Sequence, residues 1–308
     1  MVAAECGNEV LKGVWCPTLM PLDERLEPET GKFIDHCAWA LNEGCHGLVM
    51  FGTTGEANSF SVEERLRLLD AAIDAGLPAD RMMVGTGCAA LPDTVRLTRH
   101  AIDRGALGIL MLPPFYYKGA SDEALANSYD RVIDAVGAAD FRLVLYHIPQ
   151  VSGVPITPEL VDLIKARHPK TLAGVKDSTG DWEHSKMLIS RFSDLAVFPG
   201  AENLVADGLK IGGAGCISAG CNVNASAIRG LYEAALKGED VTKKHNDVDL
   251  IRNILNRFDL IPAMKQMIAD AKGDPGWARL RPPLTPLSKA DAEALRAELQ
   301  SLDFRLAA

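Results

Sequence analysis

The sequence contains fewer basic than acidic residues and no long apolar run. Lys and Arg number 32 against 41 Asp and Glu, which gives a formal net charge of -9. Nucleic acids and anionic membrane surfaces bind basic patches, so this charge argues against both as partners. No stretch approaches the ~20 apolar residues of a membrane span. The opening MVAAECGNEV has no apolar core of signal-peptide length, and we therefore expect a cytoplasmic protein.

Cysteine is present without any pairing pattern. The seven cysteines are scattered, odd in number and without a C-x-x-C pair. This is typical of reduced thiols and argues against a disulfide framework or a structural zinc site. No H-E-x-x-H or other tight cluster of metal ligands occurs in the sequence either, so we expect no metal. The cysteines are Cys6, Cys16, Cys37, Cys45, Cys88, Cys216 and Cys221.

The chain alternates apolar runs with amphipathic segments. Its 308 residues are 47% hydrophobic and 24% charged, as in a globular protein near the upper size of one hydrophobic core. Each run is rich in Val, Ile, Leu or Met and ends in a turn former, which indicates strands buried on both faces of a parallel sheet. The runs are GVWCPTLMPL, GLVMFG, RMMVGTG, GILMLP, RLVLYHIP, LAGVKD, LAVFPG and GCISAG.

Helix signals lie between these runs. Ser61 and Glu64 have the spacing of a capping box, and Thr157 precedes Pro158 at a first helical position. Eight strand–helix units in a row predict an α/β fold, a right-handed (β/α)8 TIM barrel. A doubly wound sheet is the alternative, but CPTLMPLDE follows the first strand where that fold carries a Gly-rich turn.

The last part of the chain indicates helices outside the barrel. We expect the barrel and its active site to occupy residues 1–238 and a C-terminal helical extension to occupy residues 239–308. Helices are expected near 240–256, 258–271 and 288–301, with a break at the Pro-rich RPPLTPL. No low-complexity linker separates the two parts.

Lys176 ends the apolar run LAGVKD, where burying an ammonium ion without a partner is costly. Strand alternation places it on the same face as Gly174. If that face is the barrel interior, burial favours the neutral amine, which can attack a ketone and form a Schiff base. From this segment alone, a lysine that extends past the strand end into solvent is the alternative.

Tyr146 strengthens the catalytic interpretation of Lys176. It lies in the preceding strand, so the two side chains can meet if both point inward, and a phenol beside the imine can shuttle a proton. The alternative is a core tyrosine with a satisfied hydroxyl. The next residue, His147, faces the other way and is expected to be structural.

Two loops follow strands at the end of the barrel where active sites lie. Thr53 and Thr54 in GTTGE, with the N–H groups of a Gly-flanked turn, can bind a carboxylate; a plain turn is the alternative. PPFYYKG places Tyr116 and Tyr117 after the fourth strand. Packing against a neighbouring subunit is the alternative role of these tyrosines, and it does not exclude a catalytic one.

The motifs GTTGE, PPFYYKG, LYHIPQVSGV, GVKDSTGD and GGAGCISAGCNVN occur in this order. Together they resemble the dihydrodipicolinate synthase / N-acetylneuraminate lyase superfamily, whose members are Schiff-base (class I) aldolases. The resemblance covers nearly the whole chain. It implies a (β/α)8 barrel with a C-terminal helical extension, a homotetramer built of tight dimers, and pyruvate as the 2-oxo acid released or used. No cofactor is implied, because the iminium ion withdraws the electrons.

The resemblance also implies residue roles. Lys176 matches the Schiff-base lysine, Tyr146 the tyrosine of the fifth strand, and Thr53 the hydroxyl that relays protons to it. Thr54 matches the residue that binds the carboxylate of the 2-oxo acid. Tyr117 matches the second tyrosine, which in the synthases completes the relay across the dimer interface.

The distal end of the implied site departs from the best-known members. The synthases carry an arginine five residues after the fifth-strand tyrosine, where this chain has Val151. The neuraminate lyases use an aspartate–glutamate pair after strand 7 and a serine in strand 8, where this chain has Glu202, Asn203 and Ala219. These departures argue against both activities. The expected substrate-binding residues are Thr54, Ile217, Gly200, Glu202, Asn203, Ala219 and Val151.

We therefore expect a lyase that cleaves or forms a 2-keto-3-deoxy sugar acid type substrate through aldol chemistry, with pyruvate and an aldehyde as the small molecules involved. A dehydratase acting through the same imine is an alternative, as is 4-hydroxy-tetrahydrodipicolinate synthase. An inactive barrel with a binding or regulatory role and a metal-using barrel enzyme are alternatives from other classes. The intact set of Lys176, Tyr146, Thr53 and Tyr117 favours a working enzyme.

Overall fold

The computed structural model describes residues 9–138 and 141–306, so Cys6 and the opening segment lie outside the described residues. Eight parallel strands form one sheet in the order β7-β6-β5-β4-β3-β2-β1-β8. The sheet closes where the Ala214 N–H donates to the Val197 carbonyl at 3.0 Å. The strands are β1 Gly13–Pro17, β2 Gly47–Met50, β3 Met82–Gly85, β4 Gly108–Met111, β5 Leu143–His147, β6 Leu172–Asp177, β7 Ala196–Pro199 and β8 Gly215–Ile217.

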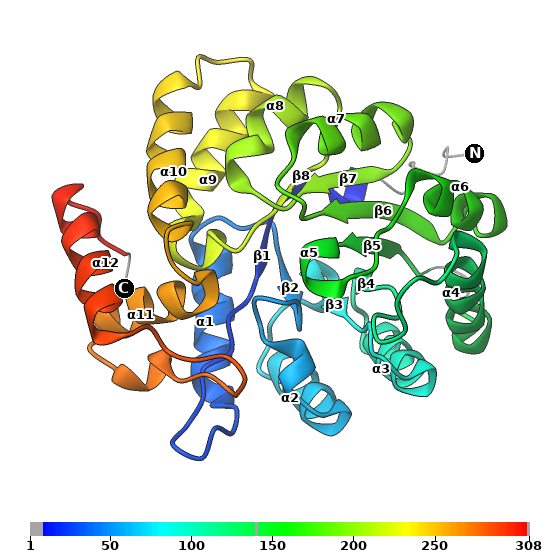
Figure 1. Ribbon diagram of the computed structural model, residues 1–308, viewed down its shortest axis with the longest axis horizontal. Coiled ribbons are helices and arrows are strands. Elements are labelled where there is room, and N and C mark those ends of the chain that lie inside the picture. The colour runs from blue at the N-terminus through cyan, green and yellow to red at the C-terminus, as the bar shows by residue number, and fades with distance from the viewer. Residues whose placement is uncertain (1–8, 139–140, 307–308) are drawn as a thin grey trace.

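Helices follow the strands and surround the barrel (Figure 1). The predicted capping box is present, because the Glu64 N–H donates to Ser61 Oγ at 3.2 Å and the Ser61 N–H donates to Glu64 Oε2 at 2.7 Å. The helices are α1 Thr30–Asn42, α2 Val62–Asp74, α3 Leu91–Asp103, α4 Asp122–Val136, α5 Pro149–Ser152, α6 Pro158–Arg167, α7 Trp182–Arg191, α8 Val205–Lys210 and α9 Cys221–Leu236. Short 3-10 turns are η1 Glu9–Leu11, η2 Ala57–Ser59, η3 Ala79–Arg81 and η4 Glu202–Leu204. The predicted (β/α)8 barrel is therefore confirmed.

The strands are buried on both faces, as their continuous apolar runs indicate. Alternate residues belong to two separate apolar clusters. Val14 and Cys16 of β1 pack in the layer between the strands and the helices, whereas Trp15 points into the barrel interior with Val144 and Phe198. This alternation decides which side chains of each strand can reach the active-site end of the barrel.

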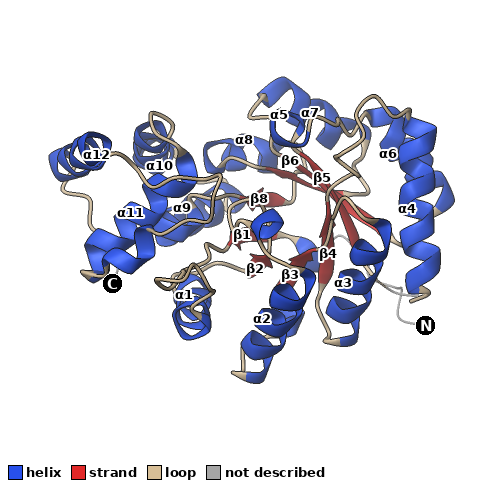
Figure 2. Ribbon diagram, turned by 60° about the horizontal axis from the view of Figure 1, so that its bottom comes forward, coloured by secondary structure: helices blue, strands red, loops and turns tan. Residues whose placement is uncertain are grey.

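Three further helices lie beside α9 at one side of the barrel (Figure 2). They are α10 Thr242–Leu255, α11 Leu260–Lys272 and α12 Lys289–Ser301, with the 3-10 turn η5 Pro275–Ala278 between the last two. Their ends lie within two residues of the predicted helices. Leu19 and Val223 of the barrel share an apolar cluster with Ile254 and Met264, so these helices pack directly on its rim. Among the described residues, no helix is long and apolar enough to cross a membrane.

A buried ion pair fixes the loop after β2 to the C-terminal helices. The side chains of Lys265 and Glu56 are fully buried, and Lys265 Nζ donates to Glu56 Oε1 and, at 2.7 Å, to the Arg279 carbonyl. The second oxygen of Glu56 accepts the Arg281 N–H at 3.2 Å. Glu56 ends the GTTGE turn, in which its own N–H donates to the Thr53 carbonyl at 3.0 Å. The C-terminal helices therefore help to hold the turn that carries Thr53.

Candidate active site

Lys176 and Tyr146 are direct partners across the β5–β6 ladder. Both point into the barrel, where Lys176 is 3% exposed and Tyr146 is 4% exposed. Lys176 Nζ lies 4.1 Å from the centre of the Tyr146 ring. The alternative in which Lys176 extends into solvent is therefore wrong. The arrangement places a primary amine and a phenol side by side at the carboxyl ends of two neighbouring strands.

Thr53 joins this pair from the loop after β2. Its Oγ1 lies 3.1 Å from the Tyr146 hydroxyl, a hydrogen bond in which either oxygen can donate. Thr54, the next residue, is buried. A hydroxyl hydrogen-bonded to the phenol can pass protons to and from it. Tyr146 thus contacts Lys176 through its ring and Thr53 through its hydroxyl.

Backbone hydrogen bonds hold the end of β6, next to Lys176, to the segments on its two sides. The Ser178 N–H donates to the His147 carbonyl at 2.8 Å, and the Gly200 N–H donates to the Asp177 carbonyl at 2.6 Å. At Gly200 an added Cβ would lie 2.5 Å from Ser178 Oγ. Only glycine therefore allows β7 to approach β6 this closely beside Lys176.

A cavity of about 440 Å³ opens above these residues. Its floor is formed by strand ends, and its upper wall comes from the C-terminal helices and the segment that follows them. The lining residues are Pro17, Thr53, Thr54, Tyr146, Ile148, Gln150, Val151, Lys176, Ser178, Gly200, Ile217, Ala219, Arg252, Asp259, Leu260, Ile261, Pro262, Pro283, Leu284 and Thr285. Most residues predicted for the site thus line one cavity, although Ala219 follows β8, which ends at Ile217, rather than lying in the strand.

Tyr117 does not join this group within a single chain. It is 80% exposed, and its ring packs edge-on against Tyr116 with 5.2 Å between the ring centres. It does not line the cavity. Its position on the surface after β4 leaves it free to contact another subunit, which is the role that the resemblance implies.

Glu202 and Asn203 were expected to line the substrate pocket, and neither does. The 3-10 turn η4 directs the Glu202 carboxylate toward β8, where it accepts a hydrogen bond from Ser218 Oγ. Asn203 Nδ2 instead donates to Asp249 Oδ1 on α10 at 3.2 Å. Both side chains are therefore used in contacts within the protein.

The C-terminal helices supply a part of the cavity that was not predicted from the sequence. Arg252 comes from α10 and reaches the cavity, where it pairs with Glu202 at 3.2 Å. Leu260 and Ile261 begin α11, and Leu284 lies within the RPPLTPL segment. No local motif marks these residues, because tertiary packing alone brings them over the barrel.

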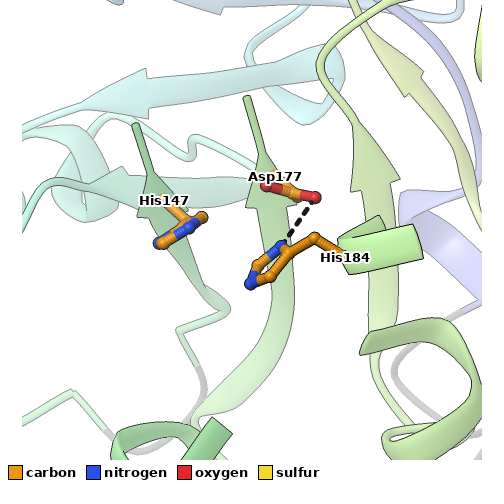
Figure 3. A group of neighbouring side chains, drawn as sticks. All are labelled: His147, Asp177 and His184. Carbon is orange, nitrogen blue, oxygen red and sulfur yellow. Dashed lines mark hydrogen bonds and ion pairs between the residues drawn. The ribbon is translucent and has the colours of Figure 1, made fainter. Parts of the chain in front are cut away.

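A second polar cluster lies on the outer face of β5 and β6 (Figure 3). Asp177 Oδ2 accepts from His184 Nδ1 at 3.0 Å and from Ser185 Oγ at 2.6 Å, while its Oδ1 accepts from the N–H and hydroxyl of Thr179. His147 stacks on His184 with 4.7 Å between ring centres.

This outer cluster has the residue types of a metal site, but the Asp177 carboxylate and one ring nitrogen of His147 are already engaged in hydrogen bonds. Besides the four donors on Asp177, His147 Nδ1 accepts the Ile156 N–H at 2.8 Å. Burial lowers the pKa of His147 to about 4, so its ring is neutral near pH 7. His147 thus faces the outer layer, as predicted, and its hydrogen bond to Ile156 supports the structural role expected for it.

Comparison with known proteins agrees with this geometry. Residues 11–302 match the model of the dihydrodipicolinate synthetase family. A protein of Chloroflexus aurantiacus described as an uncharacterized DapA-like lyase is 38% identical over 292 residues, which cover 94% of this chain and 97% of that protein.

Two solved structures are similar over the whole barrel. The crystal structure of dihydrodipicolinate synthase from Agrobacterium tumefaciens has a TM-score of 0.86 and 31% identity, covering 94% of this chain and 99% of that one. The fold also matches YagE, a prophage protein of E. coli K12 crystallised with pyruvate, with a TM-score of 0.85, 24% identity, and 95% and 98% coverage. The protein is an enzyme of the lyase class, and its chain belongs to the dihydrodipicolinate synthetase family.

Proposed function

We propose that the protein is a Schiff-base lyase that cleaves a 2-keto-3-deoxy sugar acid, or a related 2-oxo acid, to pyruvate and an aldehyde, or joins them in the reverse direction. The observation that carries this proposal is the buried Lys176 amine 4.1 Å from the Tyr146 ring, with Thr53 hydrogen-bonded to the same tyrosine. Imine formation needs an unprotonated amine and a nearby proton donor, and here a buried amine lies beside a phenol that can donate a proton.

In the proposed mechanism the substrate carboxylate binds at Thr53 and Thr54, and the Lys176 amine attacks the ketone carbon. The carbinolamine loses water, assisted by the Tyr146 hydroxyl, to give an iminium ion. In the cleavage direction the C4 hydroxyl gives its proton to Tyr146 as Tyr146 passes its own proton to Thr53 and Thr53 releases its hydroxyl proton to the relay beyond it. The C3–C4 bond then breaks, and its electron pair moves into the iminium ion to form an enamine. Protonation at C3 and hydrolysis of the imine release pyruvate and restore the amine.

We further propose that Tyr117 extends the proton relay beyond Thr53 when two subunits meet, as part of a homotetramer built of dimers. The exposure of Tyr117 and its lack of contact with Thr53 in one chain support this assignment. We propose cofactor-free chemistry in the cytoplasm, since the iminium ion performs the electron withdrawal.

The same first steps serve a dehydratase, which would lose water from the imine instead of breaking a carbon–carbon bond. Val151 lines the cavity where the synthases carry an arginine, and this disfavours 4-hydroxy-tetrahydrodipicolinate synthesis. Incubation with 2-oxo-3-deoxy sugar acids and analysis of the products tests the proposal. Pyruvate with an aldehyde indicates cleavage, and a deoxy dicarbonyl acid of unchanged chain length indicates dehydration. Turnover by Lys176→Ala at the native rate would contradict both. Absence of turnover of these acids by the unmodified protein would leave binding or regulation as the function of the barrel.

A further inference from the structure

Arg252 reaches the cavity from outside the barrel. It lies on α10, its side chain is 17% exposed, and it lines the same cavity as Lys176 and Thr54. Apart from Lys176, the charged residues of the cavity are Arg252 and Asp259, and Asp259 is exposed at the rim. Arg252 is thus the one largely buried permanent cation among the residues lining this cavity.

Glu202 holds this guanidinium in place. Its side chain is 2% exposed, and it accepts hydrogen bonds from Arg252 Nη1 at 3.2 Å and from Ser218 Oγ. A buried carboxylate needs such partners, because an unpaired charge in the interior is costly. The fit is close, since a Cβ added at Gly220 would lie 2.1 Å from Glu202 Oε1.

The guanidinium keeps donors that no protein group uses. It carries five N–H groups, and Glu202 is its one hydrogen-bond partner within residues 9–138 and 141–306. The adjacent wall of the cavity is largely apolar, formed by Leu260, Ile261 and Leu284. Inside such a wall, the remaining N–H groups require an oxygen acceptor from a bound molecule or from water.

We propose that Arg252 is the specificity-determining residue of this site and that it binds an oxygen-bearing group, a hydroxyl or a carboxylate, at the far end of the 2-oxo acid. Glu202 acts as a positioning residue for Arg252. This inference rests on the proposed function, in which Thr53–Thr54 and Lys176 fix the near end of the same molecule. Substrates with an apolar tail then leave the guanidinium donors unpaired and bind less well.

Position 151 differs between this chain and the synthases. In the synthases that this chain resembles, an arginine at this position after strand 5 holds the second substrate, and here Val151 is exposed at the mouth of the cavity. The cation that faces the substrate therefore comes from α10 rather than from the loop after β5. A cation moved to another wall selects a differently shaped molecule.

The test compares three six-carbon 2-oxo acids that differ at the far end: 2-oxohexanoate is apolar, 2-oxoadipate ends in a carboxylate, and 2-keto-3-deoxygluconate carries hydroxyls. The readout is the concentration that half-saturates borohydride trapping of the imine, with pyruvate as the reference that has no far end. We expect at least one oxygen-bearing acid to saturate at a lower concentration than 2-oxohexanoate. Arg252→Met should raise that concentration about 10-fold or more, because charge-assisted hydrogen bonds are lost. The values for pyruvate and 2-oxohexanoate should change less than about twofold.

Two control variants and the pyruvate reference distinguish a failure of the Arg252 inference from a failure of the proposed function. Arg257→Met removes an exposed arginine that pairs with Glu298 outside the cavity, and it should change none of the four values. Arg252→Met combined with Glu202→Gln avoids leaving a buried charge unpaired and should give the same loss of discrimination. If pyruvate trapping is normal and Arg252→Met affects all three acids equally, or affects none of them, the role of Arg252 is wrong and the proposed function stands. Absence of trapping with pyruvate in the unmodified protein overturns the proposed function instead.

Discussion

Lys176 Nζ lies 4.1 Å from the centre of the Tyr146 ring, and the two residues are partners in the β5–β6 ladder. The relationship depends on register, because a shift of one residue would turn either side chain to the outer face of the barrel. There it would meet the layer in which His147 and Asp177 lie. The strand pairing itself therefore brings the amine and the phenol together.

Removing the phenol hydroxyl should slow the reaction without disturbing the barrel. In Tyr146→Phe the ring keeps its contact with Lys176, but proton transfer loses its donor and acceptor. We expect kcat to fall by about 10²- to 10⁴-fold, with thermal unfolding within a few degrees of the unmodified protein. Steady-state kinetics with 2-oxo-3-deoxy sugar acids measures the loss, and Tyr129→Phe, in a tyrosine buried between β4 and α4, is the control. A rate for Tyr146→Phe equal to that of this control would contradict the role of the hydroxyl.

Breaking the Lys265–Glu56 pair should destabilise the protein. Both side chains are fully buried, so Lys265→Met leaves a carboxylate in the interior with one cation removed. We expect a loss of about 3–5 kcal/mol in the free energy of unfolding, measured by urea denaturation. Lys165→Met, which removes a half-exposed pair with Asp194, should cost less than about 1 kcal/mol. Equal losses in the two variants would show that the buried pair does not fix the GTTGE turn.

Gly220 lies at the start of α9 and Gly230 lies within it, so alanine substitutions at these two positions can be compared. A Cβ at Gly220 would lie 2.1 Å from Glu202 Oε1, whereas one at Gly230 has Lys244 Cε as its nearest neighbour at 4.0 Å. Gly220→Ala should therefore destabilise the protein by about 1–3 kcal/mol through overpacking. Gly230→Ala should leave it unchanged or stabilise it by up to about 1 kcal/mol, as expected for alanine in a helix. Thermal unfolding distinguishes them, and a tolerated alanine at 220 would argue that Glu202 is not tightly held.

Stability should fall as the pH drops from about 6.5 to about 4 because buried histidines are neutral in the fold. Burial lowers the pKa of His36 to about 4, against about 6.5 for an unfolded histidine. The unfolded chain binds the proton first, so the contribution of His36 is complete above pH 6.5 and is lost toward pH 4, on the order of 2–3 kcal/mol.

Denaturation with urea at pH 7.5, 6, 5 and 4 measures this dependence. His36→Gln keeps a donor toward Asn222 Oδ1, which His36 Nε2 contacts at 2.8 Å, and it should reduce the slope of stability against pH. His245→Gln, a half-buried histidine on α10, is the comparison. A slope unchanged by His36→Gln would mean that His36 does not remain neutral in the fold.

The barrel and the near half of the site could be predicted from the sequence because their signals are local. The run LAGVKD shows by alternation that Lys176 shares a face with Gly174, and Ser61 with Glu64 marks a helix start that the structure confirms. The rule that strand ends of a barrel face one rim placed Thr53 at the same end as Tyr146, and the family resemblance implied that the two side chains meet.

The distal half of the site could not be predicted from the sequence in the same way. Glu202 follows β7 at a rim position, yet η4 turns its carboxylate to Ser218 and Arg252 rather than into the cavity. Arg252 lies 76 residues beyond Lys176 in the sequence, and nothing near it signals a site. Such contacts depend on how α10 packs over the barrel, and a single sequence carries no direct record of that packing.

The most direct test of the central claim is borohydride reduction in the presence of pyruvate, followed by mass spectrometry of the digested protein. Imine formation requires the amine of Lys176 to be accessible from the cavity and unprotonated for part of the time. We predict one pyruvate-derived adduct on the peptide that contains Lys176, and none in Lys176→Ala. An adduct on any other lysine, or an unmodified Lys176 at saturating pyruvate, would contradict the account.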